Sequence, residues 1–331
     1  MPEFYLNYGP GIVVSSAIDR FVYVTLNEKF DGKVSVRYSM HENVEKVFQL
    51  QHSLIREMLL HYGITNGVEI VIVSDVPARG SGLGASSTML VALCLALECR
   101  NGKISPRSAY SFPEKFKTEL AENAAKIEIE ICNSPIGKQD HYSAAFGGIN
   151  RIRFEQDGHI EVTPFGGSYE FVKELENQSM LFYLDMEREY KDGHLISWIL
   201  KDQLAELHEK RKTHEMQRDN ATELWEHMTY EVMERFMDHV NENWRLKRTV
   251  HSKITNTAID HCVQRAYSAG ATAAKVCGAG GGGFIYLVVP VPMQDSVRAA
   301  LSDLHELSFG FSPKGAEVIF SEGSGSLEAV H

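Results

Sequence analysis

The sequence is poor in cysteine and contains no long apolar run. Its five cysteines form no Cys-x-x-Cys pair and no Cys/His spacing typical of a zinc site. No segment reaches the roughly 18 apolar residues that would span a bilayer, and no basic region precedes an apolar one near the N-terminus. These absences exclude zinc-finger and disulfide-framework classes, and they predict a cytoplasmic protein with reduced thiols.

Positive charge is also scarce. The chain has 33 Lys and Arg against 44 Asp and Glu, a net charge of -11, which opposes a general affinity for nucleic acid or an anionic membrane. A phosphorylated small molecule is still compatible, because backbone N–H groups bind phosphate locally whatever the net charge. The sequence gives no indication of the oligomeric state.

The length of the chain, 331 residues with 44% hydrophobic residues, is enough for two hydrophobic cores. We expect two domains, 1–172 and 173–331, because Gly166-Gly167 and a polar run follow the last expected strand of the first half. The second half is more helical. There, apolar residues at spacings of three and four predict one face of an amphipathic helix in the core, namely Trp225, Met228, Val232, Phe236 and Val240.

The first half alternates strand and helix patterns. We expect a hairpin or meander from three β-rich runs, 12–16, 21–26 and 34–38. Further patterns predict a helix over 44–61, a strand over 68–73, a buried apolar helix over 88–98 and a helix over 113–131. Near the C-terminus, a β-rich segment over 284–289 follows a second glycine loop.

A glycine-rich loop lies between the strand at 68–73 and the buried helix. Small residues there allow close approach of a ligand, and the free N–H groups at the helix start, with the positive end of its dipole, form an anion site. A triphosphate would suit such a site, and two serine hydroxyls could reach a phosphate or Mg²⁺. The predicted binding residues are Gly80, Ser81, Gly82, Leu83, Gly84, Ala85, Ser86 and Ser87.

Other kinds of glycine loop compete with this interpretation. A Walker A loop requires a Lys that is absent here, and the HRD and DFG elements of protein kinases are missing. The dinucleotide fingerprint G-x-G-x-x-A is satisfied by Gly80, Gly82 and Ala85, but its acidic partner, Glu98, ends the apolar helix instead of a second strand. A dinucleotide site and a purely structural turn both stay open as alternatives.

Two carboxylates are candidates for the chemistry. Asp140 follows the Pro- and Gly-containing segment 135–137, where a carboxylate could face a cleft and act as general base, although such an Asp is also a common cap or turn residue. Glu128, on the preceding helix, could hold Mg²⁺ beside Ser86, whereas Glu130 should face another way. The second glycine loop, 278–283, has no side chains to contribute from Gly280 onwards, so either backbone binding or close packing must explain it.

Together these segments resemble the GHMP kinase family: two glycine motifs, 77–88 and 275–283, and the loop 135–140 occur in the family's order and separations. The resemblance implies an α+β two-domain fold, with a ribosomal protein S5 domain 2-like N-terminal domain and a ferredoxin-like C-terminal domain. It also implies that Gly80–Ser87 wrap the phosphates of ATP, that Ser86 and Glu128 hold Mg²⁺, and that Asp140 is the base. Residues 280–283 would help to close the site, with Gly280, Gly281 and Gly282 among the substrate-binding residues.

Within the family, residues 135–142, 145–148 and 243–247 are most similar to the branch that phosphorylates a heptose phosphate at its anomeric hydroxyl. That product leads to nucleotide-activated heptose for surface polysaccharide. The resemblance places Lys138, Asp140 and Arg188 among the substrate contacts. Another sugar, phosphorylated at its anomeric carbon, is the alternative.

Two departures from the family pattern bear on activity. Relatives usually carry a strand with an Arg and a Gly-Gly-Gly-x-Asp motif just ahead of the segment that here starts at Pro2, so we expect that strand to be missing. A truncated, non-catalytic binder of ATP or sugar phosphate is the corresponding alternative. Second, Asp185 and Glu187 lie three residues and one residue before Arg188 and would repel a phosphate, which favours a substrate other than heptose phosphate.

Overall fold

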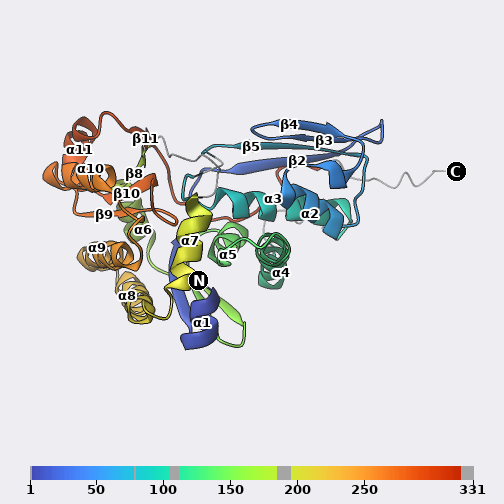
Figure 1. Cartoon of the computed structure of the whole chain (residues 1–331). Coiled ribbons are helices and arrows are strands. Elements are labelled where there is room, and N and C mark those ends of the chain that lie inside the picture. The colour runs from blue at the N-terminus through green and yellow to red at the C-terminus, as the bar shows by residue number, and fades with distance from the viewer. Residues whose placement is uncertain (1, 78–79, 104–111, 185–194, 322–331) are drawn as a thin grey trace.

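The computed structural model describes residues 2–77, 80–103, 112–184 and 195–321 (Figure 1). Three sheets with their covering helices build an α+β molecule, and the expected fold class is confirmed. No helix within these described ranges has both the length and the apolarity of a membrane span.

The largest sheet of the N-terminal half has four strands in the order β2-β5-β3-β4. Its centre pairs β3 with β5 in parallel, while the two outer pairs are antiparallel. The expected hairpin is therefore wrong, because β5 separates β2 from β3 and the first expected strand joins another sheet. The more apolar β5 takes a central place. The strands are β2 (Val22–Glu28), β3 (Val34–Arg37), β4 (His41–Val44) and β5 (Val68–Ser74).

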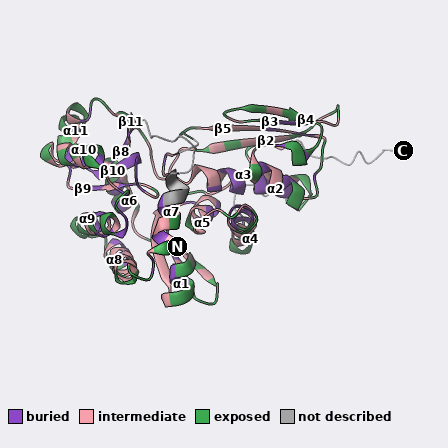
Figure 2. Ribbon diagram, in the orientation of Figure 1, coloured by how far each residue is buried: buried purple, intermediate pink, exposed green. Residues whose placement is uncertain are grey.

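Helices cover one face of this sheet (Figure 1), and their sheet-facing sides are buried (Figure 2). The central helix, α3 (Ala85–Arg100), is apolar on nearly all sides and lies in the N-terminal core, as expected. The helix predicted over 44–61 is shorter than expected, since β4 ends at Val44 and the 3-10 helix η1 (Val47–Gln49) precedes α2 (Ser53–His61). The helix predicted over 113–131 divides into α4 (Glu114–Ala125) and the π-helical η3 (Lys126–Ile131), and the short α5 (Gln139–Phe146) follows.

A second, three-stranded sheet has the order β1-β6-β7, all antiparallel. It consists of β1 (Gly11–Ser16), β6 (Ile149–Phe154) and β7 (Ile160–Pro164), and α1 (Pro2–Tyr8) packs Tyr5 on Phe154. The predicted boundary between residues 172 and 173 falls within α6 (Tyr169–Gln178), which contributes Phe171 and Leu175 to a core cluster. The division into two domains stays a prediction.

The C-terminal sheet is antiparallel, with the strand order β11-β8-β10-β9. The first and third strands along the chain occupy its centre, which is the ferredoxin-like order. Both faces are covered, because Ala274 of β9 joins one apolar cluster and its neighbour Ala273 joins another. The strands are β8 (Ser179–Leu184), β9 (Ala273–Val276), β10 (Gly283–Val288) and β11 (His305–Leu307).

The helices of this half flank the C-terminal sheet (Figure 1). The single amphipathic helix predicted through 225–240 is wrong, because the chain turns at Glu231, where φ is 58°, and forms two helices. Its apolar residues still pack in the core as expected, apart from the exposed Val232. The helices are α7 (Leu195–Ala205), α8 (Arg211–Thr229), α9 (Met233–Val250), α10 (Thr257–Ser268), the 3-10 helix η4 (Val291–Met293) and α11 (Gln294–Ala300).

Candidate active site

The two glycine loops meet backbone to backbone. A Cβ on Gly82 would lie 2.7 Å from the carbonyl oxygen of Cys277, and a Cβ on Gly283 would lie 2.5 Å from that of Ser81. A hydrogen bond of 3.0 Å from the Phe284 N–H to the Ser81 carbonyl fixes the contact. Gly82 has a φ of 75° and Gly283 has a φ of 90°, and residues other than glycine rarely adopt such values. Close packing therefore accounts for part of the glycine content of both loops.

Gly280 and Gly281 contact a different segment. A Cβ on Gly280 would lie 2.9 Å from the Cα of Ile254, and the Gly281 N–H donates to the Ile254 carbonyl at 2.9 Å. Gly282 has φ 135°. The assignment of these three glycines to substrate binding stays a prediction, and the contact with Ile254 explains why Gly280 needs to be small.

The first loop leads into the start of α3 without a capping side chain. Gly84 is the N-cap residue, with φ 70°, and no side chain accepts a hydrogen bond there. The N–H groups of the first turn are thus left for a ligand, and the helix dipole favours an anion at this point. Among the predicted binding residues, Gly82, Leu83 and Gly84 line a cleft of 1590 Å³.

Glu128 projects from the π-helical η3 toward the start of α3. Its Oε1 accepts from the Ser86 hydroxyl at 2.7 Å, and its Oε2 accepts from the Ser87 hydroxyl at 2.9 Å and lies 2.8 Å from His141 Nε2. Burial alone would raise the pKa of Glu128, but the hydrogen bonds from His141 and the two serines outweigh it and lower the pKa. The carboxylate is therefore held ionised.

The donor set around Glu128 fits Mg²⁺. A serine hydroxyl and an ionised carboxylate oxygen are the hard ligands that this ion prefers, and Mg²⁺ commonly takes only one or two protein ligands together with phosphate oxygens. Within the described residues no group of three His, Cys, Asp or Glu side chains could hold a metal. Ser86 and Glu128 would hold the ion, which would supply positive charge beside the phosphates of a nucleotide.

Asp140 lies in the first turn of α5, directly against the first glycine loop. It was expected in a loop, but Lys138 is the N-cap and the helix begins at Gln139. A Cβ on Gly84 would lie 3.0 Å from both Cβ and Cγ of Asp140, so the carboxylate borders the start of α3. Burial raises the pKa of Asp140, although His141 and Gln139 act in the opposite direction. Asp140 also lines the cleft.

Other predicted residues have other surroundings. Lys138 is already ion-paired with Glu122, at 2.6 Å, so a substrate phosphate would compete with that carboxylate. Glu130 is exposed on another side of η3, as expected. Arg188, with Asp185 and Glu187, lies outside the described residues, and its role stays a prediction.

The dinucleotide alternative is not supported. Glu98 is 3% exposed inside α3, where it accepts a 2.5 Å hydrogen bond from the Tyr62 hydroxyl and pairs with Lys103 at 2.8 Å. The adjoining sheet has one parallel pair, β3 with β5, between two antiparallel pairs, whereas a doubly wound fold has a mostly parallel sheet. Glu98 therefore makes its contacts within the N-terminal core.

Three residues near the loops were missed by sequence reasoning. His141 is fully buried against Glu128, and Lys247 and Lys275 gather beside Cys277. Only proximity to motifs could have pointed to them, because His141 follows Asp140 and Lys275 begins the second glycine motif. Lys247, on α9, ends the segment 243–247 that resembles the heptose phosphate branch, but nothing in that segment pointed to a role for its charge.

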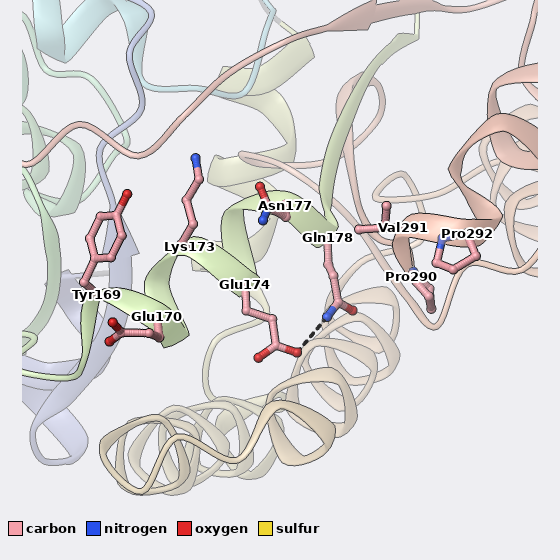
Figure 3. A pocket seen from close by; sticks show the side chains of 9 residues that line it. All are labelled: Tyr169, Glu170, Lys173, Glu174, Asn177, Gln178, Pro290, Val291 and Pro292. Carbon is pink, nitrogen blue, oxygen red and sulfur yellow. Dashed lines mark hydrogen bonds between the residues drawn. The ribbon is translucent and has the colours of Figure 1, made fainter.

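A separate surface hollow of 590 Å³ lies where α6 faces residues 290–292 (Figure 3). Its polar lining includes Glu170, Lys173 and Glu174, and Gln178 Nε2 donates to Glu174 at 3.1 Å. No residue of either glycine loop lines it. We assign no chemistry to this hollow.

Comparisons with known proteins agree with this geometry. The model of the GHMP kinases N terminal domain matches residues 49–148, and that of the GHMP kinases C terminal domain matches residues 228–306. The D-glycero-alpha-D-manno-heptose 7-phosphate kinase of Campylobacter jejuni is 26% identical over 332 residues, which cover 95% of this chain and 93% of that protein. The mevalonate kinase of Methanothermobacter thermautotrophicus is 26% identical over 313 residues, covering 91% of each.

A solved structure has the same fold. The crystal structure of a D-glycero-D-manno-heptose 1-phosphate kinase from Bacteroides thetaiotaomicron superposes with a TM-score of 0.72 at 24% identity, covering 96% of this chain and 93% of that one. The two family models match the halves of the chain that carry the first and second glycine loops. The chain therefore belongs to the GHMP kinase family and is a phosphotransferase that acts on a hydroxyl group.

Proposed function

We propose that this sugar kinase transfers the γ-phosphoryl group of ATP, with Mg²⁺, to the anomeric hydroxyl of D-glycero-D-manno-heptose 7-phosphate. The product would be a 1,7-bisphosphate on the route to nucleotide-activated heptose for surface polysaccharide. The proposed location is the cytoplasm. Support for the acceptor comes from the heptose 7-phosphate kinase of Campylobacter jejuni, to which the chain is similar, and from the similarity of residues 135–142 to that branch.

One observation carries the proposal: Asp140 lies against Gly84, at the uncapped start of α3. A phosphate bound by the helix N-terminus would therefore have a carboxylate beside it. An acceptor hydroxyl between the two would be positioned for in-line attack, which is the main requirement of phosphoryl transfer.

The proposed chemistry needs no phospho-enzyme. The acceptor oxygen bonds to the γ-phosphorus as the bond to the β-γ bridging oxygen breaks, and ADP leaves. Asp140 accepts the proton of the hydroxyl and returns it to solvent. The backbone N–H groups of the loop at Gly82–Gly84 offset the negative charge of the phosphates.

The test is ADP release at fixed Mg-ATP, with a panel of sugars and sugar phosphates, for the wild type and Asp140→Asn. We expect turnover on heptose 7-phosphate that falls by about 100- to 10,000-fold in the variant, since general base catalysis contributes that much. Asp157→Asn is the matched control, because Asp157 is an exposed turn residue.

The other outcomes discriminate between alternatives. Turnover on a different sugar would replace the acceptor and keep the kinase. Folded protein that binds ATP but turns over no acceptor would favour a non-catalytic binder. Equal rates in the wild type and Asp140→Asn would remove Asp140 as the base.

A further inference from the structure

Two lysines from distant elements meet beside the second glycine loop. Lys247, on α9, donates from Nζ to the carbonyl oxygens of Val276, at 3.3 Å, and of Gly278. Lys275, on β9, lines the same cleft as Asp140 and Gly82. Both lysines are partly buried, and they are close enough to repel each other.

Neither charge is neutralised by a carboxylate contact. In the described part of the chain no Asp or Glu forms an ion pair with Lys247 or Lys275, whereas Lys138 has Glu122 and Lys103 has Glu98. This is unusual in a protein of net charge -11, in which carboxylates outnumber cations. Burial, and then repulsion by Lys275, lowers the pKa of Lys247 to about 7, and burial lowers that of Lys275. An anion between them would relieve this cost.

The hydrogen bonds of Lys247 leave it able to bind a ligand. An ammonium group has three N–H donors, and two are directed to the carbonyls of Val276 and Gly278, so one remains. The two carbonyl bonds hold the group at the base of the loop that contacts Gly82. The charge of Lys247 also acts to lower the pKa of Asp140, so the ammonium group lies near the candidate base.

We propose that Lys247 and Lys275 form a cation pair that binds a phosphate group next to Asp140. This inference rests on the proposed function and names residues of the same site. Two phosphates could occupy that place, the terminal phosphate of ATP or the phosphate carried by the acceptor. The two sources share their chemistry, and the binding experiment distinguishes them.

A purely structural role for Lys247 makes a different prediction. If this lysine only fastened the loop through Val276 and Gly278, its removal would loosen the whole site and weaken every ligand alike. The Lys275 side chain makes no hydrogen bond within the described residues, so Lys275→Met tests the charge without disturbing such a link. Lys247→Met then tests the second member of the pair.

The experiment is calorimetric titration, in Mg²⁺ buffer, of four ligands: ATP, ADP, heptose 7-phosphate and the unphosphorylated heptose. The proteins are the wild type, Lys275→Met, Lys247→Met and the control Arg245→Met. Arg245 lies on α9 but is exposed and paired with Glu242 at 2.7 Å, so its loss changes the net charge equally. Each lysine variant loses a charged contact to the phosphate. We therefore expect its Kd for one phosphate-bearing ligand to rise by about tenfold or more, while its Kd for the matching ligand without that phosphate stays the same.

Each outcome decides the proposal. A selective loss for ATP over ADP assigns the pair to the terminal phosphate, and a selective loss for heptose 7-phosphate over heptose assigns it to the acceptor. Unchanged ratios in both lysine variants, or an equal loss for all four ligands, overturn the phosphate site. If the wild type binds no nucleotide and no heptose, the proposed function fails. The lysine pair is then tested by titration with inorganic tripolyphosphate. Equal affinity of the wild type and Lys275→Met for this ligand would overturn the phosphate site.

Discussion

Two carboxylates flank the start of α3, and their surroundings are opposite. Glu128 accepts hydrogen bonds on both oxygens, from Ser86, Ser87 and His141, and its pKa is lowered. Asp140 has one weak side-chain bond, from Gln139 at 3.3 Å, and burial raises its pKa. A carboxylate whose two oxygens both accept hydrogen bonds is suited to stay ionised beside a cation, whereas a carboxylate with few hydrogen bonds is suited to take a proton.

The contrast extends to stability. Hydrogen bonds that favour the ionised form of Glu128 stabilise the fold at neutral pH, whereas an ionised, poorly solvated Asp140 costs stability. The two sites should therefore separate activity from stability when they are changed one at a time. The following predictions test that separation, beginning with the largest effect.

Asp140→Asn should abolish most turnover without destabilising the protein. Loss of a general base costs about 100- to 10,000-fold in kcat/KM. The free energy of unfolding should stay the same or rise, because a half-buried charge with only one long side-chain hydrogen bond is removed. Kinetics and thermal denaturation measured on the same preparation check both parts, and a large drop in Tm would contradict the assigned surroundings of Asp140.

Glu128→Gln should lower both activity and stability. Both oxygens of Glu128 accept hydrogen bonds, but the amide nitrogen of glutamine cannot accept one. At least one hydrogen bond from Ser86, Ser87 or His141 is therefore lost, which lowers the free energy of unfolding by about 1–3 kcal/mol. Activity should fall by about 10- to 100-fold. Urea denaturation with Glu130→Gln as control tests this, since Glu130 is exposed two residues away. Equal stability of the two variants would show that the network contributes little.

His141→Phe should mainly raise the Mg²⁺ requirement. His141 contacts Glu128 and does not line the cleft, so its removal frees the carboxylate to rotate. A hydrogen bond that orients a metal-binding carboxylate contributes about tenfold to metal affinity. Activity titrated with Mg²⁺ measures the shift, and His159→Phe, at an exposed turn, is the control. A change in KM for the acceptor at saturating Mg²⁺ would argue for a different role.

The smallest effect is a shift in the acid limb of the pH profile. A base must be ionised, and because the pKa of Asp140 is raised, kcat/KM should begin to fall on acidification at a pH above the ordinary aspartate value of about 3.9. Below that pKa the rate should drop about tenfold per pH unit. The profile of wild-type enzyme tests this. An acid limb at or below the ordinary value would contradict the raised pKa.

Much of the site could be predicted from local sequence. The strand, glycine loop and apolar helix around Gly82 and Ser86 form one contiguous unit, so their order alone predicts an anion site at the helix start. The strand pairing could not be predicted in the same way, because β5 comes between β2 and β3 only after long-range pairing. The single helix through Val232 failed for a similar reason: periodicity does not reveal a turn at Glu231, which adopts a positive φ.

The sequence by itself determined the family, the buried helix α3 and the candidates Ser86, Glu128 and Asp140, because these depend on residue type and short spacing. Tertiary structure alone decided which glycines are required for contact between the loops, since Gly82 meets Cys277 from the other half of the chain. It also decided the opposite pKa shifts of the two carboxylates and the pairing of Lys247 with Lys275. Burial and electrostatics act through space, and they depend on neighbours that the order of residues along the chain does not specify.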